Sequence, residues 1–397
     1  MNLQKQGAIE VMMALEEAGY EAYMVGGCVR DEVLQKEVAD YDLATSALPD
    51  AVRALFLQTI PVGLAHGTVI VRHRKQSYEV TTFRQEGPYL DQRRPSSVTF
   101  IATLEEDLSR RDFTMNAMAK DRHGKLYDFF GGKQDIADKI ITTVGSPEAR
   151  FEEDPLRMMR ALRFSAVLGF TICEETQHAL CAKKALLKRV STERLAQEFI
   201  KLLGGQSAGE ALRWLFTKDL VHDLPMGHML QPRDDAFAIQ WHEAETLQEQ
   251  WALFLYEMGV TDATSFLKAW KQPNQVVKTV SKWLAFLHSG EALQTSSVLY
   301  QLGTGGAHAC WRLQNIVRGR RSKERITELQ EAIGALPIQS RQDLCLNGTD
   351  VAAWVEKEPG PWLHSLLTQI EEEVLAGRLV NERDRVKTWV KQWKENQ

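Results

Sequence analysis

Residues 26–47 read GGCVRDEVLQKEVADYDLATSA, a stretch that indicates how the first part of the chain folds and what it can bind. The segment before it, YEAYMVGG, is apolar and stops at two glycines, which predicts a β-strand. CVRDEVLQ then predicts a helix with a charged first turn, and DYDLATS predicts a second strand. A solvated surface loop would not need this order, so we interpret the stretch as a glycine turn followed by an acidic strand.

Asp40 and Asp42 are spaced by one residue, so on a strand their side chains point to the same face. Two carboxylates at that spacing repel each other unless a cation lies between them. Mg²⁺ takes one or two protein carboxylates and completes its shell with water and substrate phosphates. The pair therefore predicts a Mg²⁺ site, because the apolar strand context argues against the alternative of an acidic surface loop.

The glycine turn supplies the groups that a phosphate needs. Gly26 and Gly27 allow close approach to backbone N–H groups, and Arg30 can reach a phosphate oxygen with its forked guanidinium. A simple turn would explain the glycines alone. Their combination with Arg30 and the two acids favours a nucleotide site, to which we assign Gly27 and Arg30.

Two further segments add candidate side chains. Residues 67–84, GTVIVRHRKQSYEVTTFR, predict a β-hairpin whose second strand carries Glu79. If that strand neighbours the acidic one, Glu79 is a third acid that assists metal binding or deprotonates an attacking hydroxyl; a solvated glutamate is the alternative. Residues 103–120 predict a helix in which Arg111 is a candidate triphosphate ligand. Asp112 and Asn116 would contact a ribose hydroxyl or cap that helix.

EDPLRMMRALR (residues 153–163) carries a row of charges at steps of three, which on a helix form one strip. Asp154 can accept a hydrogen bond from an exocyclic amine while Arg157 donates to the adjacent ring acceptor. Cytosine and adenine present that edge, whereas uracil and guanine present a carbonyl beside an N–H. The pair therefore predicts selection of C and A, and leaves Arg160 and Arg163 for phosphates or for holding Asp154.

Composition narrows the class of protein. The chain has 397 residues, of which 44% are hydrophobic and 25% charged, as in a soluble globular protein of several structural units. No apolar run approaches the ~20 residues of a membrane span, and the first residues do not resemble a signal peptide, so we expect a cytoplasmic location and no membrane contact. A net charge of −5 excludes a protein that coats nucleic acid over its whole surface, but not local basic patches.

The chain changes character along its length. Residues 1 to about 145 alternate strand and helix patterns, and the rest predicts almost continuous helix. All 10 tryptophans follow residue 213. A basic run, WRLQNIVRGRRSKER (residues 311–325), predicts a solvated helix or, in an enzyme that acts on RNA, a phosphate-contact site.

Taken in order and spacing, GGCVRD, DYDLATSA, RRDFTMNAMA, DFFGG and EDPLRMMRALRF resemble the successive motifs of the bacterial tRNA nucleotidyltransferases. These are the CCA-adding enzymes, in the class II branch shared with bacterial poly(A) polymerases. STERLAQEF resembles the later neck motif. The resemblance implies an α+β protein, with a small polymerase-β-like nucleotidyltransferase sheet domain at the N-terminus followed by an all-α neck, body and tail. The expected boundaries are 1–140 for the head, 141–204 for the neck, 205–300 for the body and 301–397 for the tail.

The activity that the resemblance implies is template-independent addition of CCA to the 3′ end of tRNA. The tRNA 3′-hydroxyl would attack the α-phosphate of CTP or ATP, and pyrophosphate would leave. Mg²⁺ is the expected cofactor, tRNA the macromolecular partner, and a homodimer one possible assembly. Carried onto matching positions, the resemblance implies Asp40 and Asp42 as catalytic metal ligands, with Glu79 our added candidate. The implied nucleotide-binding residues are Gly27, Arg30, Arg111, Asp154, Arg157, Arg160 and Arg163.

The sequence by itself leaves several alternative functions open. Within the same class, the chain could add only A, only CC, or a poly(A) tail. The charged loop Gly87–Pro95 resembles the flexible element that the family needs for A addition, which argues against a CC-only enzyme. From other classes, the alternatives are a non-catalytic RNA-binding protein with a decayed head and a nucleotidyltransferase that acts on small molecules. The complete set of acids and arginines argues against the former, and the long basic-bearing helical region against the latter.

Overall fold

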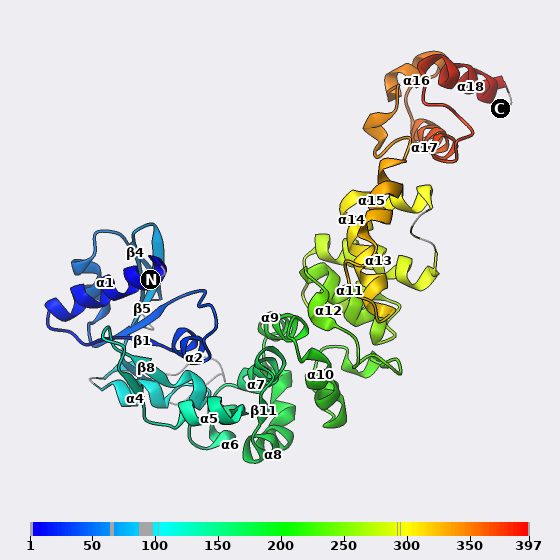
Figure 1. Ribbon diagram of the computed structural model, residues 1–397. Coiled ribbons are helices and arrows are strands. Elements are labelled where there is room, and N and C mark those ends of the chain that lie inside the picture. Colours follow the sequence, from blue (N-terminus) through cyan, green and yellow to red (C-terminus); the bar gives the residue numbers. More distant parts are fainter. Residues whose placement is uncertain are drawn as a thin grey trace. The chain divides into compact units, whose positions relative to one another are not determined.

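The computed structural model describes residues 3–63, 67–86, 98–101, 103–291, 293 and 295–395. The chain divides into two compact units, Met1–His228 and Met229–Gln397. The first contains a mixed sheet followed by helices, and the second is helical (Figure 1). The α+β class and the order of sheet before helices are therefore confirmed. The charged loop Gly87–Pro95 lies outside the described residues.

The sheet of the first unit brings the glycine turn and the acidic strand together. Its strand order is β3-β4-β5-β2-β1-β8-β9. β1 and β2 are antiparallel with Val25 opposite Asp42, so Gly26 follows directly beside the acid. β2 is parallel to β5, and all other neighbours are antiparallel. The strands are β1 (Ala22–Val25), β2 (Asp42–Thr45), β3 (Thr59–Gly63), β4 (Thr68–His73), β5 (Gln76–Thr82), β8 (Met118–Lys120) and β9 (Leu126–Asp128).

The predicted hairpin over residues 67–84 is confirmed by the antiparallel pair β4 and β5. Helix α1 (Leu3–Glu17) packs on the sheet, where the Tyr78 hydroxyl donates to the Gln4 carbonyl at 3.0 Å. A Cβ at Gly7 would lie 2.2 Å from that hydroxyl oxygen, so glycine is required there. The remaining elements of this part are α2 (Gly27–Val33), α3 (Pro49–Leu55), β6 (Arg84–Glu86), β7 (Val98–Phe100), α4 (Leu104–Ser109), a 3₁₀ turn (Thr114–Asn116), α5 (Gly132–Asp138) and β10 (Ile140–Ile141).

The prediction of one helix over residues 103–120 is wrong. Only α4 is α-helical there; a β-bridge between Phe113 and Thr143 and the 3₁₀ turn follow, and the segment ends in β8. The reason is tertiary. Phe113 is fully buried against Phe164, with ring centroids 5.7 Å apart, and β8 pairs with β1. These pairings override local helix propensity.

The helices after the sheet pack tightly around α7, the helix that contains most of the charged row. A Cβ at Gly205 would lie 2.5 Å from the Ala166 carbonyl group, so only glycine allows the chain to approach α7 here. The Ser207 N–H donates to the Ala166 oxygen at 2.8 Å. These elements are α6 (Pro147–Glu153), α7 (Leu156–Leu168), β11 (Thr171–Ile172), α8 (Glu174–Lys183), α9 (Thr192–Leu203) and α10 (Ala208–Thr217), with 3₁₀ turns at Lys184–Arg189 and Val221–Asp223.

The second unit contains three packed regions. Trp251, Phe254, Phe266 and Trp270 form an aromatic core in its first helices. Separate apolar cores surround Trp311 and Val386. Its helices are α11 (Leu247–Glu257), α12 (Ala263–Ala269), α13 (Asn274–Ser289), α14 (Ser296–Val317), α15 (Ile326–Gly334), α16 (Gly348–Val355), α17 (Pro361–Leu375) and α18 (Arg383–Glu395), with 3₁₀ turns at Trp241–Glu243 and Arg341–Asp343. A further 3₁₀ turn, Gly227–Met229, spans the boundary between the two units in the sequence. No described helix is both long and apolar enough to cross a membrane.

Candidate active site

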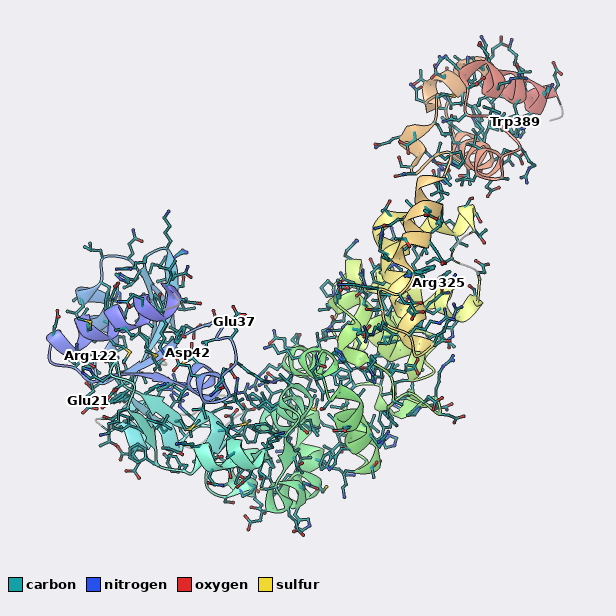
Figure 2. The ribbon with its side chains drawn as sticks, in the orientation of Figure 1. Glu21, Glu37, Asp42, Arg122, Arg325 and Trp389 are labelled. Carbon is teal, nitrogen blue, oxygen red and sulfur yellow. The ribbon has the colours of Figure 1, made fainter. Side chains whose placement is uncertain are left out.

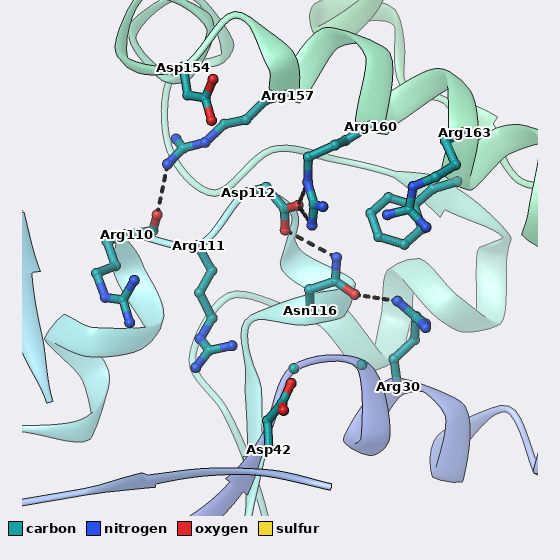
Figure 3. A pocket seen from close by; sticks show the side chains of 13 residues that line it. Arg30, Asp42, Arg110, Arg111, Asp112, Asn116, Asp154, Arg157, Arg160 and Arg163 are labelled. Atoms are coloured by element: carbon teal, nitrogen blue, oxygen red, sulfur yellow. Dashed lines mark hydrogen bonds and ion pairs between the residues drawn. The ribbon is translucent and has the colours of Figure 1, made fainter. Parts of the chain in front are cut away.

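One cavity of about 500 Å³ in the first unit collects most of the predicted site residues. Its walls come from the β1–α2 turn, the start of β2, the segment after α4 and the helix α7 (Figure 3). Asp40 and Glu79 are not among the residues that line it. The lining residues predicted from sequence are Gly27, Arg30, Asp42, Arg111, Asp154, Arg157, Arg160 and Arg163.

The acidic edge of the cavity lies where β2 begins; Figure 2 labels Asp42 there. The strand starts at Asp42, so Asp40 precedes it, and the expected strand over both acids is wrong by two residues. Both acids are nevertheless exposed, and the buried Tyr41 separates them. Leu43 pairs with Val80 in the parallel β2–β5 ladder, which places Glu79 on the strand beside Asp42.

Although part of the Asp42 side chain is exposed, the protein around it removes much of its hydration, and this burial raises the pKa of Asp42 to about 6. The negative charges of Glu79 and Asp40 add to the effect, while Arg111 opposes it. These carboxylates therefore repel one another, which a hard cation would relieve. Within the described ranges, no cluster of three or more His, Cys, Asp or Glu side chains could enclose a metal. The donor set fits an ion such as Mg²⁺, which binds few carboxylates and keeps water or substrate oxygens.

A chain of hydrogen bonds joins the glycine turn to α7. Arg30 Nη1 donates to Asn116 Oδ1 at 2.7 Å, and Asn116 Nδ2 donates to Asp112 Oδ1 at 3.1 Å. Arg160 completes the chain, since its Nε lies 2.8 Å and its Nη2 2.6 Å from Asp112 Oδ2. Burial raises the pKa of Asp112, but Arg160, Asn116 and the Phe113 N–H more than offset it, so the pKa falls to about 2. Asp112 and Asn116 thus hold the two arginines in place (Figure 3).

Positive charge is concentrated around Phe164. The guanidinium carbons of Arg30, Arg160 and Arg163 lie 5.2, 5.4 and 3.7 Å from its ring centroid. Cation–π contacts at such distances are attractive, yet the arginines repel one another. The buried Glu198 on α9 offsets part of this repulsion: its Oε2 accepts from Arg163 Nε at 2.5 Å, and its Oε1 lies 3.6 Å from Arg160.

Asp154 lies outside the helix that carries the arginines, contrary to the predicted strip. It follows the last residue of α6 and has an extended backbone, with φ −142° and ψ 98°. The reason is Pro155, because a proline disfavours helical geometry in the residue before it. Arg194 on α9 holds its carboxylate with both terminal nitrogens, at 3.2 and 2.7 Å. Arg160 and Arg163 therefore do not fix Asp154; Arg194 does.

Arg157 is buried beside Asp154 and is anchored by other groups. Its Nη1 donates to Glu153 at 2.8 Å and its Nη2 to the Arg110 carbonyl at 3.2 Å. Asp154 and Arg157, which the sequence predicts to contact a base, thus lie side by side in the cavity (Figure 3).

Arg111 reaches across the glycine turn. Gly26 has a φ of 74°, which favours glycine, and a Cβ there would lie 2.9 Å from Arg111 Nη1, so the missing side chain also leaves room for the guanidinium. Asp107, which is 1% exposed, anchors the side chain through Nη2 at 3.4 Å. The Nε of Arg111 is buried and has no hydrogen-bond partner in the described part of the chain.

The sequence did not predict the anchoring roles of Asp107, Arg194 and Glu198, although the neck motif STERLAQEF contains the last two. Asp107 stands three residues before Arg110, a spacing that suggests a helical ion pair. Arg194 and Glu198 are one turn apart within STERLAQEF, which predicts one shared face of α9. Those spacings give the face but not the partners, because the partners lie on other elements.

Family models match three segments of the chain. Residues 22–142 match the poly A polymerase head domain, residues 169–228 the probable RNA and SrmB-binding site of polymerase A, and residues 242–390 the putative tRNA nucleotidyltransferase domain 2. A curated CCA-adding enzyme of Geobacillus sp. (strain WCH70) is 44% identical over 388 residues, covering 97% of this chain and 96% of that protein. The chain belongs to the family of CCA-adding enzymes.

Solved structures of this family agree. The crystal structure of the Bacillus stearothermophilus CCA-adding enzyme in complex with CTP superimposes with a TM-score of 0.92 at 39% identity, covering 100% of this chain and 99% of that one. A tRNA nucleotidyltransferase complexed with a primer tRNA and an incoming ATP analog has a TM-score of 0.61 at 25% identity, covering 81% of this chain and 98% of that chain.

The ion pair between Arg194 and Asp154 predicts a measurable coupling between the effects of the two side chains on stability. In a double-mutant cycle of Arg194→Ala and Asp154→Ala, we expect the free energies of unfolding to be non-additive by about 1–3 kcal/mol, because the two side chains bind each other and are partly buried. Urea denaturation of the four proteins measures this. The exposed pair Arg53 and Asp50 on α3, 3.4 Å apart, is the control cycle and should give close to zero. Equal coupling in both cycles would contradict the assignment.

Proposed function

We propose that this protein adds CCA to the 3′ end of tRNA without a template, using CTP and ATP. The observation that carries the proposal is one cavity that combines Asp154 and Arg157 with a row of arginines and an acidic edge. Base edge, phosphates and reacting hydroxyl would each find a partner of matching chemistry there. The full-length similarity to CCA-adding enzymes supports the same conclusion.

The base would be selected by Asp154 and Arg157. Asp154 accepts from the exocyclic amine of cytosine or adenine, and Arg157 donates to the neighbouring ring nitrogen. Arg194 occupies both oxygens of Asp154 on one side, but a carboxylate has further lone pairs, so it can still accept the amine. Uracil and guanine would place a carbonyl oxygen against the Asp154 carboxylate and a ring N–H against the Arg157 guanidinium. Neither contact is a hydrogen bond, and each polar group left unpaired costs about 1–3 kcal/mol.

The triphosphate would lie between the glycine turn and the arginines. Gly27 and Arg30 line the cavity on one side, and Arg111 lines it too, with its Nη1 beside Gly26. Arg160 and Arg163 complete the positive wall. Because Asn116, Asp112 and Glu198 already orient these guanidinium groups, little reorganisation is needed when phosphate binds.

Transfer would take place at the acidic edge. The tRNA 3′-oxygen attacks the α-phosphorus, the bond from that phosphorus to the bridging oxygen breaks, and pyrophosphate leaves. Asp40 and Asp42 are the residues that would hold Mg²⁺, which when bound supplies positive charge to the attacking and leaving oxygens. Glu79 lies on the strand beside Asp42 and is our candidate for taking the hydroxyl proton or assisting the metal.

We further propose the domain division 1–140, 141–204, 205–300 and 301–397, with the head catalytic, the neck reading the base, and body and tail contacting tRNA. We also propose a cytoplasmic location. Sedimentation of the purified chain would distinguish a monomer from the proposed homodimer.

Single-nucleotide incorporation tests the activity. Purified protein, Mg²⁺ and a tRNA lacking its 3′ end are incubated with each labelled NTP alone and with CTP plus ATP. We expect two additions with CTP alone and a stop after C, C and A with both. A long A ladder would indicate a poly(A) polymerase, and A added only to a tRNA ending in CC an A-adding enzyme. No incorporation would favour a non-catalytic RNA-binding protein.

Removing the base-reading pair is expected to relax nucleotide choice. For Asp154→Ala with Arg157→Ala, we expect discrimination of CTP and ATP against UTP and GTP, measured as ratios of kcat/KM, to fall about 10- to 100-fold. Arg189→Ala is the control, because Arg189 is exposed in the same unit and outside the cavity. Unchanged selectivity in a folded double variant would refute this role.

Metal binding is expected to depend on Asp42. With CTP and Mg²⁺ but no tRNA, we expect the melting temperature of the wild type to rise by several degrees over CTP with chelator, and Asp42→Asn to lose this increment. The increment should shrink as pH falls through about 6, because Asp42 must lose its proton to bind the ion. Asp50→Asn, an exposed change on α3, is the control. An Asp42→Asn variant that keeps the full increment would contradict the site.

A further inference from the structure

A second basic cavity lies in the helical unit, where α14 ends and α15 begins. Its volume is about 190 Å³, and Arg318, Arg320 and Arg325 line it together with a single acid, Glu328. Arg325 is labelled on this unit in Figure 2. The three arginines belong to the basic run 311–325. None of them is among the residues that line the candidate active site.

The loop that carries these arginines is held by buried side chains. Asn315, 5% exposed, donates from Nδ2 to the carbonyls of Ser322 at 3.3 Å and Glu324 at 3.0 Å. Trp311 Nε1 donates to the same Glu324 carbonyl at 2.9 Å, and the Arg320 N–H returns to the Asn315 carbonyl at 2.8 Å. A solvated basic loop would not need this scaffold, so the arginines are presented on a fixed backbone.

One of the three guanidinium groups in the cavity is paired, and two are not. Arg325 Nε donates to Glu328 at 2.5 Å, so the acid already has a partner. In the part of the chain that the structure describes, Arg318 and Arg320 form no side-chain hydrogen bond or ion pair. One cationic side chain would be enough to interact with the negative end of the α14 dipole. Three arginines converge on this cavity, which is more than the helix end needs. An anion with several acceptor oxygens would match them.

The size of the cavity limits the ligand. Pockets that enclose a whole small-molecule ligand are typically about 300–1,000 Å³, so this cavity suits one group rather than a nucleoside triphosphate. Gln314 and Asn315 add neutral polar groups to the wall, as contacts to phosphodiester oxygens often do.

We propose that this cavity binds one backbone phosphate of an RNA strand through Arg318 and Arg320, with Arg325 adding charge. The identity of the RNA as tRNA rests on the proposed function. Phosphate contacts position a nucleic acid without reading its sequence, so the cavity would set where the RNA lies on this unit.

Binding of tRNA without any NTP tests the proposal independently of catalysis. Affinity is measured by fluorescence anisotropy over a salt series for the full-length wild type, Arg318→Gln, Arg320→Gln and the double variant. We expect several-fold weaker binding, and a slope of log K against log salt that is smaller by about 1 in the double variant. Arg321→Gln is the matched control, because it removes the same charge from the same loop outside the cavity. It should change the slope markedly less.

Inorganic phosphate, exchanged for chloride at constant ionic strength, separates the two sources of such a group. If the cavity binds RNA phosphate, added phosphate competes with tRNA on the wild type and not on the double variant. If phosphate raises the melting temperature only when both arginines are present but tRNA affinity is the same in all variants, the site binds a free anion and the proposal is overturned. Equal losses in Arg321→Gln and the double variant, or no loss in either, would overturn it too. A protein that shows the expected binding pattern but adds no nucleotide would refute the proposed function alone.

Discussion

The ion pair between Arg160 and the buried Asp112 is the contact on which the geometry of the candidate active site depends. A carboxylate that is 8% exposed would cost several kcal/mol to bury alone. Arg160, Asn116 and the Phe113 N–H satisfy it, and they hold its pKa near 2 against the opposing effect of burial. Because this pKa lies below the usual value, the stabilisation is present at neutral pH and is lost as pH falls through about 2. One buried charge thus joins α7 to the segment after α4, and holds Arg30 through Asn116.

The same network leaves the cavity with an excess of positive charge. Arg30, Arg160 and Arg163 surround one phenylalanine ring, and Glu198 offsets only part of their repulsion. Burial lowers the pKa of the Arg163 guanidinium, which shows that this environment disfavours its charge. At the opposite edge, burial raises the pKa of Asp42, and repulsion from Glu79 and Asp40 raises it further. A triphosphate would offset the repulsion among the arginines, and a divalent cation would offset the repulsion among the carboxylates. The unliganded protein therefore gives up some stability in order to bind these ligands.

The net charge of the whole chain does not indicate these local concentrations of positive charge. The net charge is −5, yet each unit contains a cavity rich in arginine. The two cavities differ in construction. The first orients its arginines with buried acids, as a site for a large and precisely placed substrate requires. The second holds its backbone with buried amide and indole donors, and among the described residues Arg318 and Arg320 have no side-chain partner, which suits the proposed anion contact.

Local pattern was enough to predict the glycine turn, the hairpin, the acidic pair and the charged row at Arg157, Arg160 and Arg163, because each depends on residues a few positions apart. It failed for residues 103–120, where burial of Phe113 and pairing of β8 with β1 override helix propensity. Only the tertiary structure decided that Glu79 lies beside Asp42, that Arg194 holds Asp154, and that Glu198 serves two arginines. Those partners are far apart in sequence, and spacing along a chain fixes the face on which a side chain lies but not the element that packs against it.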